Sequence, residues 1–146
     1  MTVASLVDTN VLIYRCDPRF PGKMERATEI LRKGAEDRSL LIPHQALVEF
    51  VAATTRSRGS DGPILRLAQA LPIVEEFMES YEVLMPNEAV VRTAFTGVSV
   101  HGIHWYDAHL WAYAVEFEVP EILTEDLPVG PRCGVVRYVN PFVGLD

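Results

Sequence analysis

Short apolar runs alternate with longer helical segments along almost the whole chain. The apolar runs have the length of strands and lie at residues 3–7, 40–42, 81–85, 122–123 and 135–139. The segments between them have helical composition or spacing, at residues 23–36, 44–55, 64–80, 87–96 and 105–117. Strands that alternate with helices form parallel sheets, because each helix returns the chain to the edge where the previous strand began. The pattern predicts an α/β fold, whose central parallel sheet is covered by helices on both faces.

The length of the chain, 146 residues, is enough for one domain with a buried core. No internal repeat, low-complexity tract or linker divides the sequence, so a single domain over residues 1–146 is expected. The N-terminal segment lacks the basic and apolar regions of a signal peptide, and no apolar run approaches the roughly 20 residues of a membrane helix. These features predict a cytoplasmic protein that does not enter a membrane.

The acidic balance of the chain restricts how it could bind nucleic acid. Twenty acidic residues against 13 basic ones give a formal net charge of −7. A protein that coats nucleic acid relies on Lys and Arg to neutralise phosphates, so the net charge argues against this mode of binding. A nuclease remains compatible with the charge, because carboxylates that hold metal ions make a site negative until the metal binds.

The stretch "LVDTNVLIY" places Asp8 directly after the first predicted strand. Ligands of open parallel sheets gather beyond the carboxyl ends of the strands, so Asp8 is a candidate site residue. The alternative is a capping aspartate at a helix start. Asn10 is expected to take that role, as the N-cap of a short helix that begins near Val11.

Two further carboxylates lie on predicted helices among apolar or small side chains. Glu49 is surrounded on its helix face by alanines, which leave room around the carboxylate; the alternative is an ordinary exposed glutamate. Asp107 shares a face with Leu110 and Trp111. An ionised aspartate there costs several kcal/mol unless it is paired, hydrogen-bonded or bound to a cation, and its alternative role is helix capping.

The stretch "ILTED" repeats the arrangement around Asp8, because an apolar run is followed by Thr124, Glu125 and Asp126. Its alternative interpretation is an acidic turn before Pro128. Four carboxylates that meet at one edge of the sheet would repel one another unless cations or protons offset their charge. Ligand sets made only of oxygen atoms favour hard ions, so the sequence predicts a site for Mg²⁺, with Mn²⁺ as a substitute.

The ordered motifs "LVDTNVLIY", Glu49, "WYDAHLWAYA", "LTEDL" and the terminal "VVRYVNPF" resemble those of PIN-domain ribonucleases, in particular VapC-type toxins. The resemblance implies a three-layer α/β/α sandwich and Mg²⁺- or Mn²⁺-dependent endonucleolytic cleavage of RNA by metal-activated water. It also implies a toxin of a type II toxin-antitoxin system that binds a cognate antitoxin and forms a homodimer.

Residue by residue, the resemblance places the catalytic and metal-binding acids at Asp8, Glu49, Asp107 and Asp126. Thr9, Asn10 and Thr124 fall on the positions that support these acids. Glu125 lies beside these acids, and the resemblance does not assign it to the site. One departure is visible: a small hydroxyl residue is frequent three positions before the third acid, and His104 stands there.

Arginine supplies eleven of the 13 basic residues, and its planar guanidinium suits bidentate contacts with phosphate. Arg15 and Arg19 follow the first motif, and Arg56 and Arg58 end the helix that carries Glu49. These four are candidate RNA contacts. The alternative for each is a solvated surface arginine.

Two other functions are compatible with parts of this pattern. The chain could be a PIN-like module that only binds a partner, which would require that its acids hold no metal. It could also be a phosphatase with Asp8 as the nucleophile, since that chemistry begins with an aspartate after a strand. Such enzymes typically carry a second aspartate two residues later, and Asn10 occupies that position.

Overall fold

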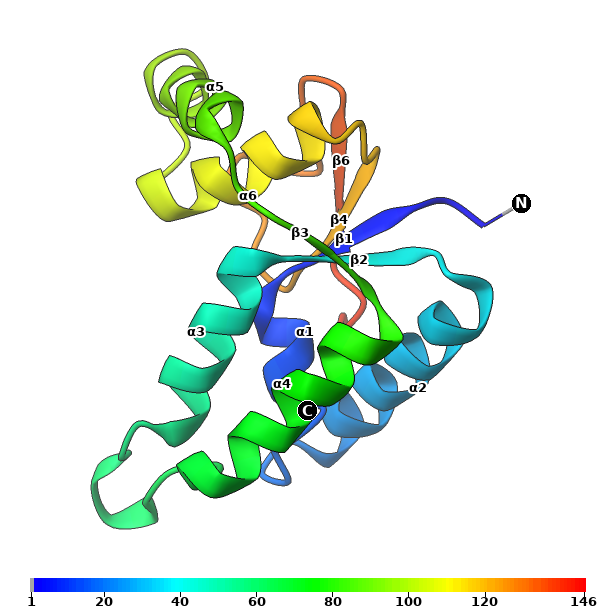
Figure 1. Ribbon diagram of the computed structural model, residues 1–146, viewed down its shortest axis with the longest axis vertical. Helices are drawn as coiled ribbons and strands as arrows, with labels where there is room; N and C mark the ends of the chain where they lie inside the picture. The colour runs from blue at the N-terminus through cyan, green and yellow to red at the C-terminus, as the bar shows by residue number, and fades with distance from the viewer. Residues whose placement is uncertain (1) are drawn as a thin grey trace.

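The structure is a computed structural model that describes residues 2–146, and a six-stranded sheet crosses its middle (Figure 1). The strands are β1 (Ser5–Val7), β2 (Leu40–Pro43), β3 (Glu82–Leu84), β4 (Glu121–Leu123), β5 (Arg132–Cys133) and β6 (Val136–Val139). The helices are α1 (Thr9–Tyr14), α2 (Pro21–Asp37), α3 (His44–Thr55), α4 (Leu67–Ser80), α5 (Glu88–Ser99) and α6 (Trp105–Glu116), with a short 3₁₀ turn at Gly59–Asp61.

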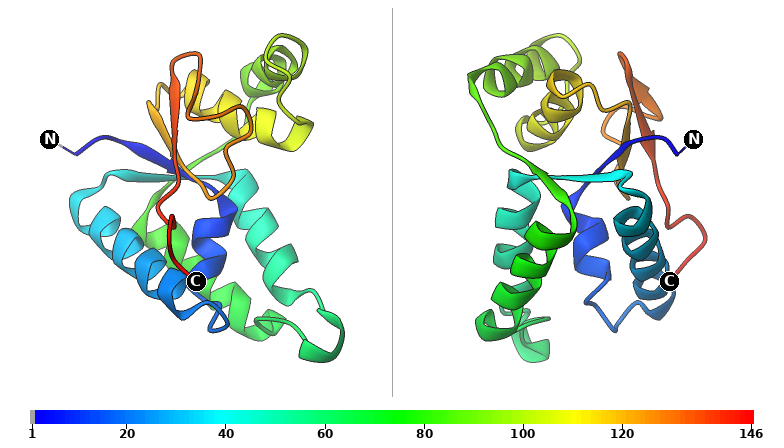
Figure 2. Two further views of the ribbon diagram at one scale, coloured as in Figure 1. Left: turned by 180° about the vertical axis from the view of Figure 1, so that it is seen from behind. Right: turned by 45° about the vertical axis from the view of Figure 1, so that its right-hand side comes forward.

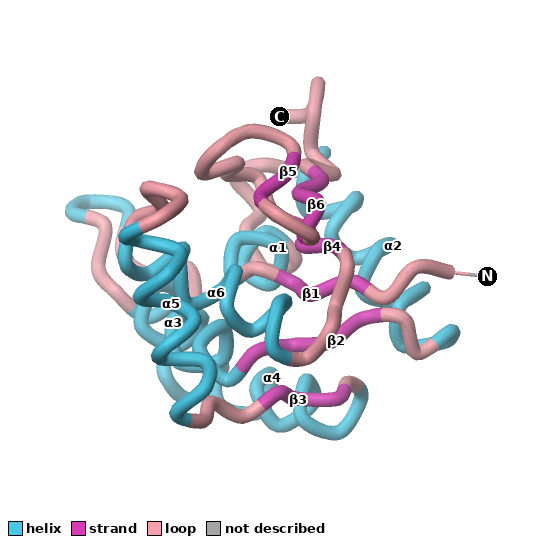
Figure 3. The backbone as a smooth tube through the Cα atoms, turned by 90° about the horizontal axis from the view of Figure 1, so that it is seen from above, coloured by secondary structure: helices cyan, strands magenta, loops and turns pink. Residues whose placement is uncertain are grey.

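The strands lie side by side in the order β3-β2-β1-β4-β6-β5, which Figure 3 shows from above. All neighbouring pairs are parallel except β5 and β6. The prediction of a central parallel sheet is confirmed for five strands, and the antiparallel β5 was not predicted. β5 has only two residues, which are too few to show an apolar pattern in the sequence. It joins β6 through a tight turn in which Gly134 has a positive φ of 57°.

Helices cover both faces of the sheet and give three layers, as both views of Figure 2 show. α5 and α6 pack on one face, and α1 to α4 pack on the other (Figure 1). Successive strand residues point to opposite faces, so Leu6 joins the α5–α6 core while Val7 joins the other core. Both faces are therefore apolar, which is why the strands appear in the sequence as short continuous apolar runs.

Several helix starts differ from the predicted ones. Asn10 is not the cap of the first helix: α1 begins at Thr9, and Asp8 is its N-cap residue. Residues 64–80 contain a single helix, which begins at Leu67 and has Pro72 in its second turn, where proline has no N–H to donate to the Ala68 carbonyl.

Gly34 permits a close contact between α2 and β2. A Cβ atom at this position would lie 2.2 Å from the Cδ1 atom of Leu40, a residue of β2 that is 6% exposed. We expect Gly34→Ala to lower the free energy of unfolding by about 1–3 kcal/mol, because the core must shift to admit the methyl group. Urea unfolding tests this, with Glu36→Ala on the exposed side of α2 as the control. Equal midpoints for the two variants would contradict the close packing.

None of the helices within residues 2–146 combines the length and the hydropathy that a membrane span requires.

Candidate metal centre

Four acidic side chains from distant parts of the chain line one open pocket of about 430 Å³. Asp8 follows β1, Glu49 lies on α3, Asp107 lies in the first turn of α6, and Asp126 follows β4. The lining is completed by Thr9, Asn10, Ile13, Gln45, Ala52, Ala53, Arg56, Tyr106 and Leu110. The predicted convergence of these acids on one pocket agrees with the geometry.

The parallel pairing of β1 with β4 explains why two of the acids are neighbours. Val7 is aligned with Leu123, and the Asp8 N–H donates to the Leu123 carbonyl at 3.0 Å. The segments that follow the two strands therefore leave the sheet side by side, at the carboxyl edge where ligands of such sheets bind.

The Asp8 carboxylate caps α1 and lines the pocket at the same time. Its Oδ1 accepts a hydrogen bond from the Thr9 N–H at 2.7 Å, and its Oδ2 accepts one from Thr124 Oγ1 at 2.7 Å. The capping interpretation and the site interpretation are thus both compatible with its position. These two hydrogen bonds, with a longer one from Asn10 Nδ2 to Oδ2 at 3.4 Å, hold the carboxylate in one orientation.

Asn10 and Thr124 tie the two strand ends together. Asn10 Nδ2 donates to Thr124 Oγ1 at 3.1 Å, and Asn10 Oδ1 accepts from the Glu125 N–H at 3.2 Å. The Asp126 N–H donates to Thr124 Oγ1 at 3.0 Å. The Asn10 side chain therefore fixes the segment that carries Asp126.

Glu49 is held from two sides, and one of its partners was not predicted. Thr9 Oγ1 donates to Glu49 Oε2 at 2.7 Å, and Gln45 Nε2 donates to Glu49 Oε1 at 2.9 Å. Gln45 also donates to the Tyr106 carbonyl at 3.3 Å, which connects α3 to the start of α6. The spacing of Gln45 and Glu49, four residues apart on one helix, was the available signal for this contact.

The environment of Asp8 and Asp107 disfavours their ionised forms. The pKa of Asp8 is raised to about 6: burial has the largest effect, the hydrogen bonds from Thr124 and from the Thr9 N–H act against it, and the charges of Glu49 and Asp107 add to it. Burial and the neighbouring Asp126 raise the pKa of Asp107 above its usual range, against a favourable effect of His104. No ion pair among the described residues includes any of the four acids. No ion pair with a basic side chain therefore offsets their charge.

The chemistry of the donor set fits a hydrated hard cation. Within residues 2–146, no three acidic, histidine or cysteine side chains stand close enough together to hold one ion directly. Mg²⁺ usually keeps several waters and binds through one or two carboxylates, so it does not need a closed cage of protein ligands. An open pocket lined by oxygen donors has the composition that such an ion selects.

The four candidate arginines lie in different surroundings. Arg56 is exposed and lines the pocket with the acids. Arg15 donates to Glu76 at 2.9 Å, outside that lining. Arg19 and Arg58 lie near Asp17, at 2.6 and 3.9 Å from its Oδ2 atom. The structure brings only one of the four to the pocket.

Glu125 and His104 lie next to the centre but outside its lining. The Glu125 carboxylate accepts hydrogen bonds from Tyr14 and from Lys23, both at 2.7 Å, so a basic partner already balances its charge. His104 is exposed and precedes α6 without a capping hydrogen bond from its side chain.

Comparison with known proteins identifies the fold. No family model matches the sequence, and no curated protein matches it significantly. The structure is similar to a chain of DNA-bound VapBC from Salmonella typhimurium, with 19% identity, a TM-score of 0.69, and coverage of 96% of this chain and 99% of that one. It is also similar to a chain of VapBC2 from Rickettsia felis bound to a promoter fragment, with 14% identity, a TM-score of 0.69, and coverage of 94% and 98%.

A third similar structure is a chain of a toxin-antitoxin complex from Klebsiella pneumoniae, with 14% identity, a TM-score of 0.65, and coverage of 95% and 98%. The coverage leaves almost no part of either chain unmatched. The protein therefore has the fold of chains found in VapBC complexes, which confirms the α/β fold expected from the resemblance to VapC-type PIN domains.

Proposed function

We propose that this chain is a Mg²⁺- or Mn²⁺-dependent endoribonuclease and the toxin of a type II toxin-antitoxin system. The observation that carries the proposal is the convergence of Asp8, Glu49, Asp107 and Asp126 on one pocket with no basic partner among the described residues. The similarity to chains of VapBC and other toxin-antitoxin complexes supports the second part of the proposal.

In this proposal, Asp8, Asp107 and Asp126 would hold a hydrated divalent ion, one or two of them directly and the rest through its waters, and Glu49 would be a further ligand or orient water. A divalent cation supplies Lewis-acid stabilisation of the phosphoryl oxygens and a lower pKa for the attacking water. Thr124 and Thr9 keep the carboxylates of Asp8 and Glu49 in place by their hydrogen bonds. Arg56, at the same pocket, contacts a phosphate of the substrate.

The chemistry of the product ends tests the reaction. Attack by water does not need the RNA 2′-hydroxyl, so the products should carry 5′-phosphate and 3′-hydroxyl ends. Sequencing of RNA 5′ ends after induced expression, with Asp8→Asn as the control, would locate the cuts. Cyclic phosphate ends, or cuts that persist in the control, would contradict the proposal.

The phosphatase alternative requires an acid/base group two residues after the nucleophile. That residue, Asn10, is an amide whose side chain bonds to Thr124 and to the Glu125 N–H. An amide has no ionisable proton to exchange at neutral pH, so Asn10 cannot serve as the acid/base group. This residue therefore disfavours the phosphatase.

Replacement of Thr124 should weaken metal binding without loss of the fold. Thr124 is fully buried and donates to Asp8 Oδ2, and valine has nearly the same shape without the hydroxyl. We expect Thr124→Val to lower Mn²⁺ affinity by roughly 10- to 100-fold, as removal of groups that orient metal ligands typically does. Thr124→Ser keeps the donor and should retain the affinity. Equal Mn²⁺ affinity for the two variants would exclude this role of the hydroxyl.

We further propose that a cognate antitoxin binds the chain and that the chain forms a homodimer. The similar structures are complexes with antitoxins, which supports the first statement. Light scattering coupled to size exclusion tests the second, because a homodimer has twice the 16.3 kDa mass of one chain. A single-chain mass at every concentration tested would contradict it.

A further inference from the structure

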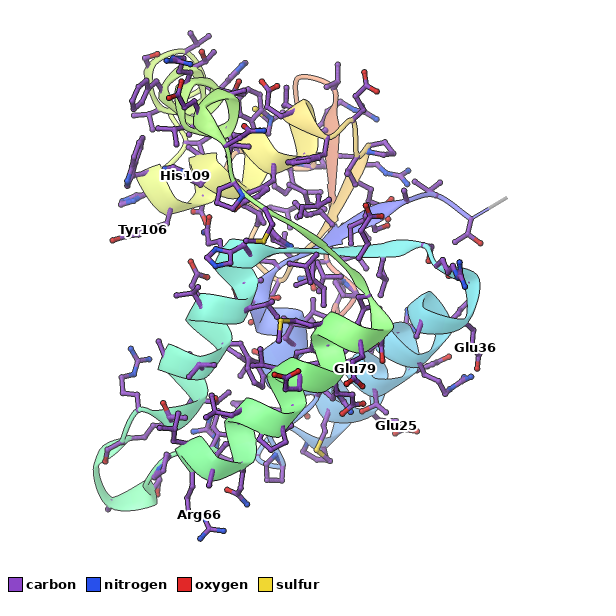
Figure 4. All side chains as sticks on the ribbon, in the orientation of Figure 1. Glu25, Glu36, Arg66, Glu79, Tyr106 and His109 are labelled. Carbon is purple, nitrogen blue, oxygen red and sulfur yellow. The ribbon has the colours of Figure 1, made fainter. Side chains whose placement is uncertain are left out.

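Tyr106 presents an exposed aromatic ring at the mouth of the acidic pocket. It precedes Asp107 in the first turn of α6, it is 70% exposed, and it is one of the residues that line the pocket. Figure 4 shows its side chain projecting outward from the start of α6. The ring is therefore open to solvent next to the pocket that holds the four acids.

The backbone beneath this ring is fixed, while the ring itself faces solvent. The Tyr106 carbonyl accepts a hydrogen bond from Gln45 Nε2 at 3.3 Å, which ties it to the helix that carries Glu49. The neighbouring Trp105 is stacked on Phe95, with ring centres 5.7 Å apart and planes 15° apart. In the described part of the chain, no aromatic ring packs on the ring of Tyr106. Its faces are therefore available to an aromatic group of a ligand.

Arg56 adds a positive charge at the same pocket. It ends α3, it is exposed, and its guanidinium forms no ion pair within residues 2–146. It lines the same pocket as Tyr106. A planar guanidinium beside a site for divalent cations is suited to a phosphate group.

We propose that Tyr106 is a base-stacking residue: a base next to the cleaved bond packs on its ring while Arg56 contacts a backbone phosphate. This inference rests on the proposed nuclease function and adds the residue that holds the nucleobase. Unpaired bases stack on aromatic side chains in the recognition of single-stranded RNA. Gln45, bonded to Tyr106, and Arg56 lie at opposite ends of α3, about 16 Å apart along the helix, so a single strand of several nucleotides could contact the ring and the guanidinium together. A protein surface packed over the pocket would bury Arg56 and the acids at a cost in free energy.

The test measures binding of a short single-stranded RNA that contains 2-aminopurine, whose fluorescence falls when the base stacks. All variants carry Asp8→Asn, so that the RNA is not cut. We expect Tyr106→Ala to weaken binding by about 5- to 100-fold and to abolish the quenching, since one base stack on an aromatic side chain has that effect. Tyr106→Phe should match the parent.

Phe117→Ala is the matched control, because this aromatic residue lies at the far end of α6 and is 37% exposed. It should leave binding and quenching unchanged. Tyr106→Ala binding equal to the parent, or no measurable binding by the parent, would overturn the inference. A changed oligomeric mass in Tyr106→Ala with unchanged RNA affinity would also overturn it and assign the ring to a contact with a second copy.

The proposed function can fail separately from this inference. Mg²⁺-dependent cleavage that requires Asp8 but is insensitive to Tyr106→Ala would keep the nuclease and reject the stacking role. Stacking that depends on Tyr106, in a protein that cuts no RNA, would keep the nucleotide contact and reject the nuclease.

Discussion

Asp8→Asn should lower the rate of Mg²⁺-dependent RNA cleavage by at least about a hundredfold. Asn removes one negative oxygen from the centre of the pocket while it keeps the size of the side chain. Loss of groups that merely orient metal ligands costs roughly 10- to 100-fold in affinity or activity, and loss of a ligand should cost no less. Initial rates of cleavage of a fluorescent RNA at saturating Mg²⁺ measure the effect.

The matched control is Asp61→Asn, the same substitution in an exposed turn outside the acidic pocket. It should cleave at the rate of the wild type. Full activity of Asp8→Asn with Mg²⁺ present would reject the assignment of the centre.

Asp8→Asn should also stabilise the metal-free protein. The folded-state pKa of Asp8 is raised to about 6, so the folded protein holds this proton more tightly than the unfolded chain does. The stabilising contribution of the protonated form is complete below the unfolded pKa near 4 and is lost as the pH rises through about 6. At pH 7.5 the buried charge then costs about 1–3 kcal/mol, and Asn avoids this cost.

Urea unfolding in EDTA measures this second effect. Asp8→Asn should be more stable than the wild type at pH 7.5, and the difference should shrink toward pH 4. The cap of α1 is preserved in the variant, because the amide oxygen can still accept the hydrogen bond from the Thr9 N–H. A variant that is destabilised equally at both pH values would contradict the raised pKa of Asp8.

The alternation of strands and helices was readable from the sequence because each strand is buried on both faces. Leu6 and Val7 point into different cores, and both are apolar, so the strand stands out as a continuous run. β5 could not be identified in the same way. Its two residues, Arg132 and Cys133, pair only with β6, and their place depends on a turn at Gly134.

The acids of the site were predictable because each stands where a strand ends or on a helix face that turns inward. Their supporting contacts were less accessible, since they join segments that are far apart in the chain. Gln45 illustrates this, because its bond to the Tyr106 carbonyl exists only when α3 and α6 are brought together. The candidate RNA contacts could not be predicted from sequence position alone. Arg15, Arg19 and Arg58 lie near the acidic motifs in the sequence, but in the structure they lie beside acids outside the pocket.

Asn10 shows how one residue changes its role once the tertiary contacts are known. The local pattern favours it as a helix cap, since amides accept from backbone N–H groups at helix starts. Asp8 takes that position, one residue before the helix, and frees the Asn10 amide to bond with Thr124 and Glu125. Propensity decides between such residues only when no long-range partner competes.

Calorimetric titration of Mn²⁺ into the wild type and into Asp8→Asn tests the central claim most directly, because it measures the ion at the four acids without reference to any substrate. The account predicts saturable binding by the wild type that is abolished or weakened by at least about a hundredfold in Asp8→Asn. Indistinguishable titrations of the two proteins, or no heat of binding in the wild type, would contradict it.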